Sequence, residues 1–274
     1  MNNLISAAFF RLKRNIIAVI CIISMLIYGV VVPFSIYLDN IKFGHNASPD
    51  KAFGGYVIPV CVLTAFMCCV LFGEEYDIGT LRNKIVIGHS RKNIYLAGLF
   101  ICIIAGEMMC IAFLVPSTLL DLILLGEFKN SLNVLTMYFV SGSLCVSACV
   151  SLYCMLMLTM QKRISGTVLT LFVMLVIIYI GLIVEQSLKL PPQTYQYHYV
   201  NGTITESFGE NPNYPKGLYR TFLEYLYDFL PSDQAWQFNT MTADNLPRMA
   251  ISSCVTIIFT VLWGIRIFEK KDLK

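Results

Sequence analysis

Charged residues are scarce in this chain of 274 residues. Only 14% of its residues are Asp, Glu, Lys or Arg, whereas 57% are hydrophobic and the mean hydropathy is +0.67. A soluble globular domain carries about 25% charged residues, so the composition predicts an integral membrane protein. The net charge is only +3, and the cations gather beside apolar runs. That distribution is typical of membrane orientation and not of nucleic-acid binding.

Several motifs of catalysis and nucleotide binding are missing. The chain has no Gly-x-x-x-x-Gly-Lys-Ser/Thr loop, no Gly-Lys pair and no His-Glu-x-x-His motif. Its three histidines, His45, His89 and His198, are far apart in expected loops. Neither a metal centre nor a histidine-based catalytic set can be assembled from them. The sequence therefore predicts a protein that is not an enzyme and holds no metal or cofactor of its own.

The ten cysteines all fall inside apolar runs, and none lies in an expected outer loop. This distribution argues against a disulfide framework. Their spacing does not resemble a zinc site. We interpret them as small apolar residues that face lipid or neighbouring helices.

Six apolar runs are long enough to cross a bilayer, because a membrane helix needs about 20 such residues. They cover residues 15–38, 56–72, 97–120, 134–160, 166–185 and 249–267. Thirteen of the 20 cations fall in the short segments that lie on one side when both termini are cytoplasmic. The positive-inside rule therefore predicts six spans in one domain, residues 1–274, with both ends in the cytoplasm.

Residues 1–14, before the first span, place apolar side chains on one helical face and polar ones opposite. This pattern predicts a short helix in the membrane interface, with a simple polar lead-in as the alternative. The longest polar segment, residues 186–248, is rich in tyrosine. Within it, residues 217–230 have helical periodicity. We expect short re-entrant helices that dip into the outer leaflet, with a mobile aromatic loop as the alternative.

Glu107 is the one carboxylate well inside an apolar run. A charge at the centre of a bilayer costs about 2.5–3.5 kcal/mol on insertion scales, so this side chain should face protein or water. One interpretation places Glu107 on a transport path. The other is a structural hydrogen bond to a small residue of a neighbouring helix.

The most informative stretch is residues 73–96, a charged segment between the second and third spans. Gly79 interrupts the chain, Thr80 is expected to cap a short helix over residues 81–87, Gly88 ends it, and Ser90 caps the next span. A short helix held between two membrane helices can transmit force from a soluble motor. The alternative is a plain basic inner loop.

Residues of this stretch resemble the inner loop of type-2 ABC exporter permeases. In that superfamily an acidic residue and an aromatic one precede Gly-Thr-Leu-Arg, and Ser-Arg precedes the next span. The matching positions are Glu74, Glu75, Tyr76, Gly79, Thr80, Leu81, Arg82, Ser90 and Arg91. Residues 231–235 and the tail, residues 267–273, are similar to the family's outer re-entrant segment and usual end.

The resemblance implies a permease that works by alternating access and resembles the small permeases of bacterial peptide-antibiotic or lantibiotic export and immunity. Glu74, Glu75, Tyr76, Gly79, Thr80, Leu81 and Arg82 would lie at or near the coupling helix. Two copies of a separate ATPase would bind ATP and Mg²⁺ and drive two permease copies in the bacterial cell membrane. The substrate would be a peptide, antibiotic or lipid-like amphiphile. A membrane sensor, immunity or assembly protein that transports nothing is the alternative.

Overall fold

The computed structural model describes residues 2–44, 48–160, 162–200 and 203–270. The last four positions of the tail, residues 271–274, lie outside the described residues. Eleven helices and one two-stranded sheet make up the described chain. In order they are α1 (Asn2–Arg14), α2 (Ile16–Phe43), α3 (Asp50–Phe53), α4 (Val57–Asp77), α5 (Thr80–Val86), α6 (Arg91–Leu124), α7 (Leu132–Thr159), α8 (Arg163–Leu188), β1 (Gln193–Val200), β2 (Thr203–Glu210), α9 (Gly217–Phe229), α10 (Pro231–Asn239) and α11 (Leu246–Lys270).

Six helical segments are long and apolar enough to cross a membrane, which confirms the predicted six-span helical fold. They are α2, the α3–α4 segment, α6, α7, α8 and α11. The protein is therefore a multi-pass membrane protein. The helices extend beyond the apolar runs at several ends, because polar residues at each end continue the same backbone hydrogen-bond pattern. Helix α4, for example, continues to Asp77.

Helices α4 and α7 form the centre of the bundle, and α2, α8 and α11 lie around it. In its most apolar window α4 is 67% buried, whereas α8 is only 22% buried. The outer faces of α2, α8 and α11 carry exposed Ile, Leu, Val and Phe side chains. Such faces are stable only where hydrocarbon covers them.

Helix α7 is rich in Ser, Gly, Cys and Ala, and these small residues allow it to pack closely against its neighbours. Gly142 lies directly against Tyr56 and Val57, at the start of the α4 span. Ser141, Ser147 and Ala148 are buried on the same helix. Helix α11 packs along α7, and α2 packs along α6.

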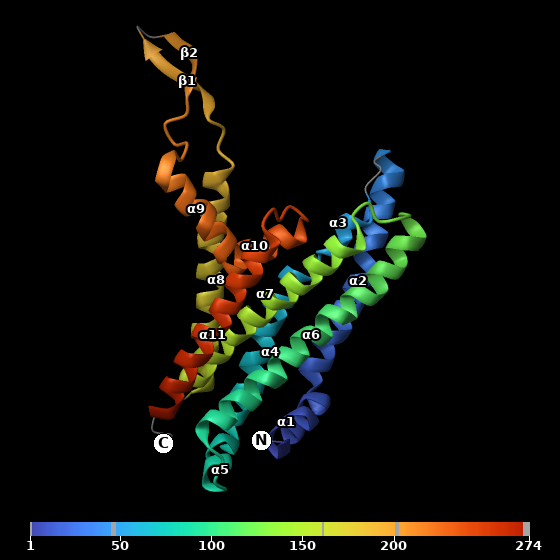
Figure 1. Ribbon diagram of the computed structural model, residues 1–274, viewed down its shortest axis with the longest axis vertical. Helices are drawn as coiled ribbons and strands as arrows, with labels where there is room; N and C mark the ends of the chain where they lie inside the picture. The colour runs from blue at the N-terminus through green and yellow to red at the C-terminus, as the bar shows by residue number, and fades with distance from the viewer. Residues whose placement is uncertain (1, 45–47, 161, 201–202, 271–274) are drawn as a thin grey trace.

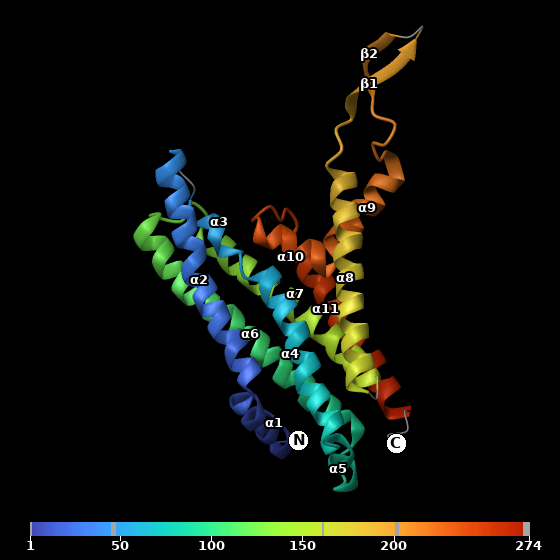
Figure 2. The same ribbon diagram turned by 180° about the vertical axis from the view of Figure 1, so that it is seen from behind.

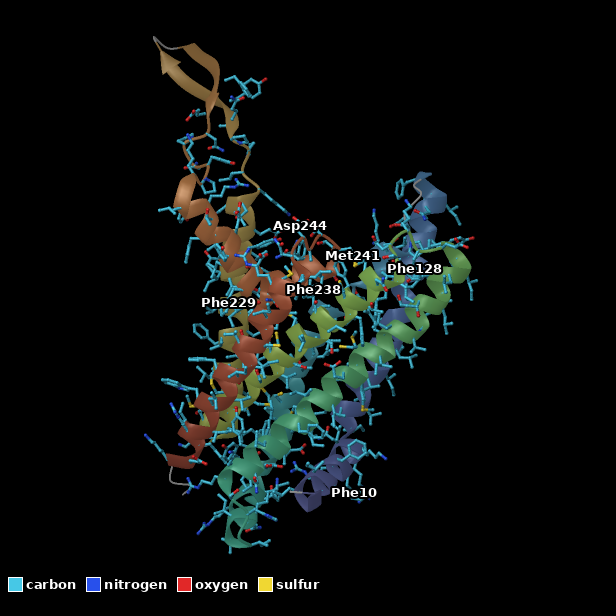
Figure 3. The ribbon with its side chains drawn as sticks, viewed as in Figure 1. Phe10, Phe128, Phe229, Phe238, Met241 and Asp244 are labelled. Carbon is cyan, nitrogen blue, oxygen red and sulfur yellow. The ribbon has the colours of Figure 1, made fainter. Side chains whose placement is uncertain are left out.

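The two termini and α5 lie at one end of the bundle, and the β1–β2 hairpin projects from the other (Figures 1 and 2). An even number of spans requires both termini to lie on the same side. Helix α1 runs beside this end of α6. Its Leu4 and Leu12 are buried, while Phe10 is 59% exposed (Figure 3). The apolar face predicted for the membrane interface thus packs mainly against the bundle.

The segment between α8 and α11 contains the two expected short helices, α9 and α10, and also a hairpin that the sequence analysis did not predict. β1 pairs with β2 in antiparallel register, with Gln193 opposite Glu210 and Val200 opposite Thr203. Tyrosine alternates with Gln and His along β1, and an Asn-Gly pair at residues 201–202 separates the strands in the sequence. That combination is a hairpin signal, which the tyrosine content of the segment obscured.

The contact between α2 and α6 depends on a glycine. A Cβ atom at Gly29 would lie 2.5 Å from the backbone oxygen of Phe113 and 2.9 Å from Cγ of Pro116. We expect Gly29→Ala to lower the free energy of unfolding by about 1–3 kcal/mol, because overpacking forces the backbones apart. Thermal unfolding of the purified protein in detergent measures this change. Val30→Ala, on the exposed side of the same helix, is the control, and an equal effect of both variants would contradict the prediction.

Candidate functional site

The connection between α4 and α6 is a sharp turn, a short helix and a second turn. Gly79 has φ +71° and Gly88 has φ +99°, and both values favour glycine. Between them α5 extends over Thr80–Val86, close to the predicted helix. Thr80 does not cap it: Thr80 is the first helical residue, and its hydroxyl donates to the Glu75 carbonyl oxygen at 3.3 Å. The left-handed Gly79 places Thr80 inside the helix, which explains the difference.

Glu75 joins three helices at this turn. Its Oε1 accepts hydrogen bonds from Arg11 of α1 and from Nζ of Lys84 of α5, the latter at 2.7 Å. Arg11 also donates to the Leu71 carbonyl oxygen at 3.3 Å. The Glu75 side chain is 10% exposed, whereas those of Arg11 and Lys84 are 32% and 23% exposed. A buried carboxylate with two cationic partners therefore fixes α5 to α4 and α1.

The residues around Glu75 hold the same end of α4 to other helices. The Tyr76 hydroxyl donates to the Leu158 carbonyl oxygen of α7 at 3.0 Å. Arg163, at the start of α8, donates to Asp77 at 2.8 Å. Glu74 lies 3.4 Å from the side-chain nitrogen of Asn15, the residue that caps α2. A displacement of α5 would therefore move the end of α4, and with it the contacts of α4 with α1, α2, α7 and α8.

The far side of α5 is open and chemically mixed. Leu81 is buried beneath the helix, whereas Arg82 is exposed. Ile78 is 71% exposed, and Val86 and Ile87 are 79% and 77% exposed. Apolar side chains at such exposure, next to a cation, are typical of a surface that contacts another protein.

The start of α6 is tied to the end of α11. Ser90 accepts a hydrogen bond from the backbone nitrogen of Asn93 at 3.3 Å, so the predicted cap is confirmed. Arg91 donates to the carbonyl oxygens of Phe268 and Glu269, both at 3.2 Å. A cation at the C-terminal end of a helix also interacts favourably with the helix dipole. Residues 73–96 and the described part of the tail, two of the three segments for which the sequence analysis noted a resemblance, thus meet in space.

Glu107 lies away from α5, on α6, and faces α7. Ser143 donates to one carboxyl oxygen at 2.5 Å and Ser147 to the other at 3.2 Å. These contacts correspond to the structural interpretation, a hydrogen bond to small residues of a neighbouring helix. Glu107 does not line either of the two cavities described next. Its place on a transport path stays a prediction.

A cavity of about 210 Å³ lies between α4, α7, α8 and α10. Its wall is mostly apolar, with Asp233 and Glu185 as its two carboxyl groups. The other lining residues are Ile58, Cys61, Val62, Cys149, Leu152, Tyr153, Met174, Ile177, Ile178, Leu182, Pro231, Ser232, Ala235 and Trp236. We call this space the apolar cavity.

A second, polar cavity of about 460 Å³ shares Glu185 with the first. It lies among the ends of α8, α9, α10 and α11, which are at the end of the bundle opposite α5 (Figure 1). Asp244, which is labelled in Figure 3, is one of its lining residues. We call this space the acidic cavity, because four carboxyl groups and only two cations line it: Glu185, Glu224, Asp228, Asp244, Lys189 and Arg248.

The carboxyl groups of the acidic cavity differ in whether a cation is paired with them. Arg248 lies 3.1 Å from Asp228 and stacks over the ring of Tyr225. Burial raises the pKa of Asp228, an effect that Arg248 partly offsets. Burial, together with nearby carboxylates, raises the pKa of Tyr227 to about 12.

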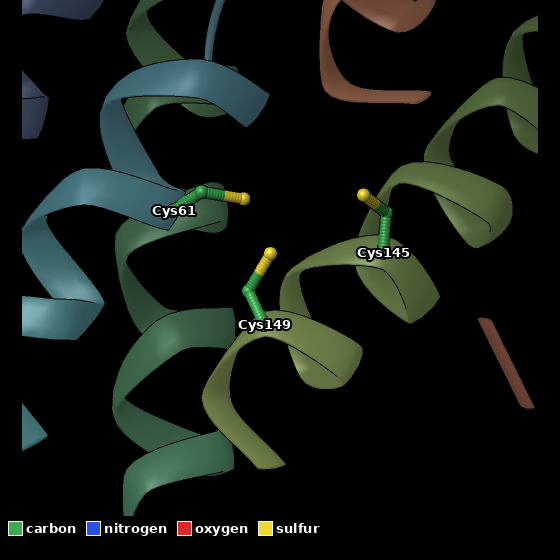
Figure 4. Close-up of side chains that lie close together, drawn as sticks. All are labelled: Cys61, Cys145 and Cys149. Atoms are coloured by element: carbon green, nitrogen blue, oxygen red, sulfur yellow. The ribbon is translucent and has the colours of Figure 1, made fainter. Parts of the chain in front are cut away.

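Six of the ten cysteines form two thiol triads in the bundle. Cys61, Cys145 and Cys149 form one (Figure 4), and Cys68, Cys102 and Cys154 form the other. Within each triad the sulfur atoms lie within 4.8 Å of one another. The sequence analysis did not foresee this, because the three sulfurs of each triad come from different helices or are separated along one helix.

Three sulfurs at this separation are compatible with a trigonal soft metal ion, since sulfurs 2.3 Å from a shared ion lie about 4 Å apart. However, three thiolates around a divalent ion carry a net negative charge, and both triads are fully buried. An uncompensated charge in such surroundings is costly. We therefore keep the interpretation of the triad cysteines as small apolar side chains between neighbouring helices.

No protein-family model, curated protein or solved structure matches this chain.

Sequence reasoning missed Asp233 and Glu185 as partners. Glu185 ends an apolar run, where solvated carboxyl groups are common, and Asp233 belongs to the polar segment, residues 186–248. Only the folding of α10 back onto α8 brings the two carboxyl groups to one cavity. One sequence signal was present: Gly181, one turn before Glu185, leaves room for Ser232 and Asp233 against α8.

The contacts of Glu75 generate a stability prediction. We expect Glu75→Gln to lower the free energy of unfolding by about 1–3 kcal/mol, because the buried acceptor loses the charge that its two cationic partners face. Glu74→Gln is the matched control and should change it by less than about 0.5 kcal/mol, because the contacts of Glu74 are long. Thermal unfolding in detergent distinguishes the two, and equal midpoints would contradict the role assigned to Glu75.

Proposed function

We propose that this chain is the permease subunit of an ATP-binding-cassette exporter and that α5 is its coupling helix. The observation that carries the proposal is the construction of α5. One side is fixed to the membrane helices through Glu75 and Leu81, while the other presents Arg82, Val86 and Ile87 to solvent. A helix fixed on one side and open on the other is suited to receive force from a second protein. The resemblance of residues 73–96 to the inner loop of type-2 permeases supports the same conclusion.

The proposed mechanism is alternating access. Two copies of a separate ATPase subunit bind ATP and Mg²⁺ and close on each other, and the closure displaces α5. Because the end of α4 is bonded to α1, α7 and α8 through Glu75, Tyr76 and Asp77, the displacement changes the packing of these helices. A second permease copy completes the transporter, and ATP chemistry takes place in the partner.

We propose the bacterial cell membrane as the location, with α5 and both termini in the cytoplasm. The support is the count of cations: most lie in the short segments at the α5 end, and the fewer cations of the opposite end are spread over longer segments.

The proposed substrate is a peptide, an antibiotic or a lipid-like amphiphile taken from the membrane. An apolar cavity that shares one residue with a polar cavity suits a molecule with an apolar body and a polar head. Nothing in the net charge of +3 favours nucleic acid as a partner.

Changes on the open side of α5 test the proposal. We expect Arg82→Glu and Ile87→Asp each to reduce recovery of the nucleotide-binding subunit at least about tenfold in co-purification, because each removes a contact of the docking surface. Both side chains are exposed, so the thermal midpoint of the permease should stay unchanged.

The control is Leu218→Asp on α9, which is 90% exposed at the opposite end of the bundle and should leave recovery unchanged. Wild-type permease that recovers no nucleotide-binding subunit from its native membrane would overturn the proposal and favour a sensor or assembly protein.

The orientation has a separate test. Nine of the ten cysteines are buried and only Cys254 is exposed. The Cys254→Ala variant therefore has no exposed thiol that would react with a labelling reagent. In that background we expect Asn83→Cys, at an exposed position of α5, to react with a membrane-impermeant maleimide in inverted vesicles and not in intact cells. Labelling in intact cells would place α5 outside and end the coupling proposal.

A further inference from the structure

The carboxyl group of Asp233 is buried, and one of its oxygens lacks a hydrogen-bond partner in the described part of the chain. It is 3% exposed and lines the apolar cavity, and its Oδ2 has no hydrogen-bond partner among the described residues. A buried polar atom without a partner costs about 1–3 kcal/mol. The buried Oδ2 atom of Asp233 therefore destabilises the fold unless a ligand supplies the missing hydrogen-bond donor.

Helix α10 holds Asp233 rigidly in this place. Gln234, which is 1% exposed, donates to the Asp228 carbonyl oxygen at 2.7 Å and to the Ser252 hydroxyl at 2.6 Å, and it accepts from Ser253 at 2.8 Å. Ser232 donates to the Ile177 carbonyl oxygen of α8 at 3.1 Å. These bonds fasten α10 to α8, α9 and α11, so Asp233 cannot turn out of the cavity to reach water.

The charges around the cavity leave a negative excess. Glu185, the other carboxyl group in the wall, is paired with Lys189 at 2.5 Å, whereas no cation of the described residues is paired with Asp233. Burial and the neighbouring Glu185 raise the pKa of Asp233 to about 7. In the adjoining acidic cavity four carboxyl groups outnumber two cations. Both spaces should therefore attract a cation.

The rest of the apolar cavity is suited to hydrocarbon or aromatic groups. Ile177, Ile178 and Leu182 of α8 face Ile58 and Val62 of α4 across it. A ligand that satisfies both parts of the wall must combine a cationic head with an apolar body.

We propose that the apolar and acidic cavities form one binding site for a cationic amphiphile, whose ammonium or guanidinium group is held by Asp233 and Glu185 and whose apolar body lies against α8. Such a head donates charge-assisted hydrogen bonds to the Oδ2 atom of Asp233, which has no partner among the described residues. The inference rests on the proposed transport function for its purpose, but the site can be tested without any ATPase.

The protein carries its own reporter for this site. It has two tryptophans, Trp236 in the wall of the apolar cavity and Trp263 on the exposed face of α11. In a Trp263→Phe background the fluorescence therefore comes from Trp236 alone. We expect 12-bromododecylamine, whose bromine quenches tryptophan on contact, to quench Trp236 saturably in the purified permease in phosphatidylcholine nanodiscs. 12-Bromododecanoic acid, which has the same chain and the opposite charge, should quench only to the level set by its partition into lipid.

Asp233→Asn should lower the affinity for the amine at least about tenfold, because the substitution removes the negative charge and keeps the shape of the side chain. Glu107→Gln is the matched control: it neutralises a carboxyl group of the same bundle that touches neither cavity, and the affinity should not change. Glu185→Gln is a second test variant that decides the matter if Asp233→Asn does not fold, and it should also weaken the amine.

The pH dependence gives an independent readout. Protonation of Asp233 removes its charge, so affinity for the amine should fall as the pH is lowered through about 7. The dependence should be lost in Asp233→Asn. The other ionisable groups that line the two cavities also respond to pH, and their response remains in the variant as the background. They are Cys61 of α4, Cys149 and Tyr153 of α7, Glu185 and Lys189 of α8, Glu224, Tyr227 and Asp228 of α9, Asp244 before α11, and Arg248 of α11.

Equal quenching by the amine and the acid, or an unchanged affinity in both carboxyl variants, would overturn the site. Such a result would leave the docking of an ATPase at α5 untouched, because no ATPase is present in the measurement. Conversely, saturable binding of the amine by a permease that recruits no ATPase would support the site and remove transport as its purpose.

Discussion

The ion-paired carboxylate of Glu75 is the interaction on which the α5 end of the bundle depends. It is largely shielded from water and accepts from a cation on each side, one in α1 and one in α5. Removing a partner from a shielded charge is costly, so the three helices are expected to move as one unit. A loop without this anchor would bend when pushed, whereas an anchored helix passes displacement to α4. This is why we regard α5 as part of the membrane machinery and not as a simple connection.

The two ends of the bundle differ in chemistry in a way that fits a directional task. At the α5 end, exposed apolar residues lie beside cations, a combination that favours contact with a protein. At the opposite end, carboxyl groups outnumber cations around a polar cavity that shares Glu185 with the apolar cavity. Helix α10 connects this end to the centre, because its buried polar residues bond to α8, α9 and α11. A change in the packing of α7 or α8 would therefore alter the cavity walls as well.

Polar groups inside the bundle follow two different rules. Glu107 is satisfied by two serines of α7, and such satisfaction is what a carboxyl group within an apolar bundle requires. Asp233 is buried more deeply, but one of its oxygens has no hydrogen-bond partner in the part of the chain that the structure describes. The thiol triads show that proximity alone is not a site: their sulfurs lie close together and are buried, but three thiolates around a divalent ion would leave a net negative charge there, which is costly.

The sequence by itself determined the membrane class, the six spans and the position of the short helix between Gly79 and Gly88. These features depend on local composition and on backbone conformations that few residues adopt, so they can be read along the chain. The tertiary structure alone decided the partners. Glu75 meets Arg11, Asp233 comes to the same cavity as Glu185, and the cysteines of α4, α6 and α7 gather in triads, because helices distant in the sequence pack side by side. The cap expected from Thr80 failed for a related reason, since the left-handed Gly79 set where the helix begins. Side-chain contacts of this kind depend on the rotation and depth of whole helices, which hydropathy does not specify.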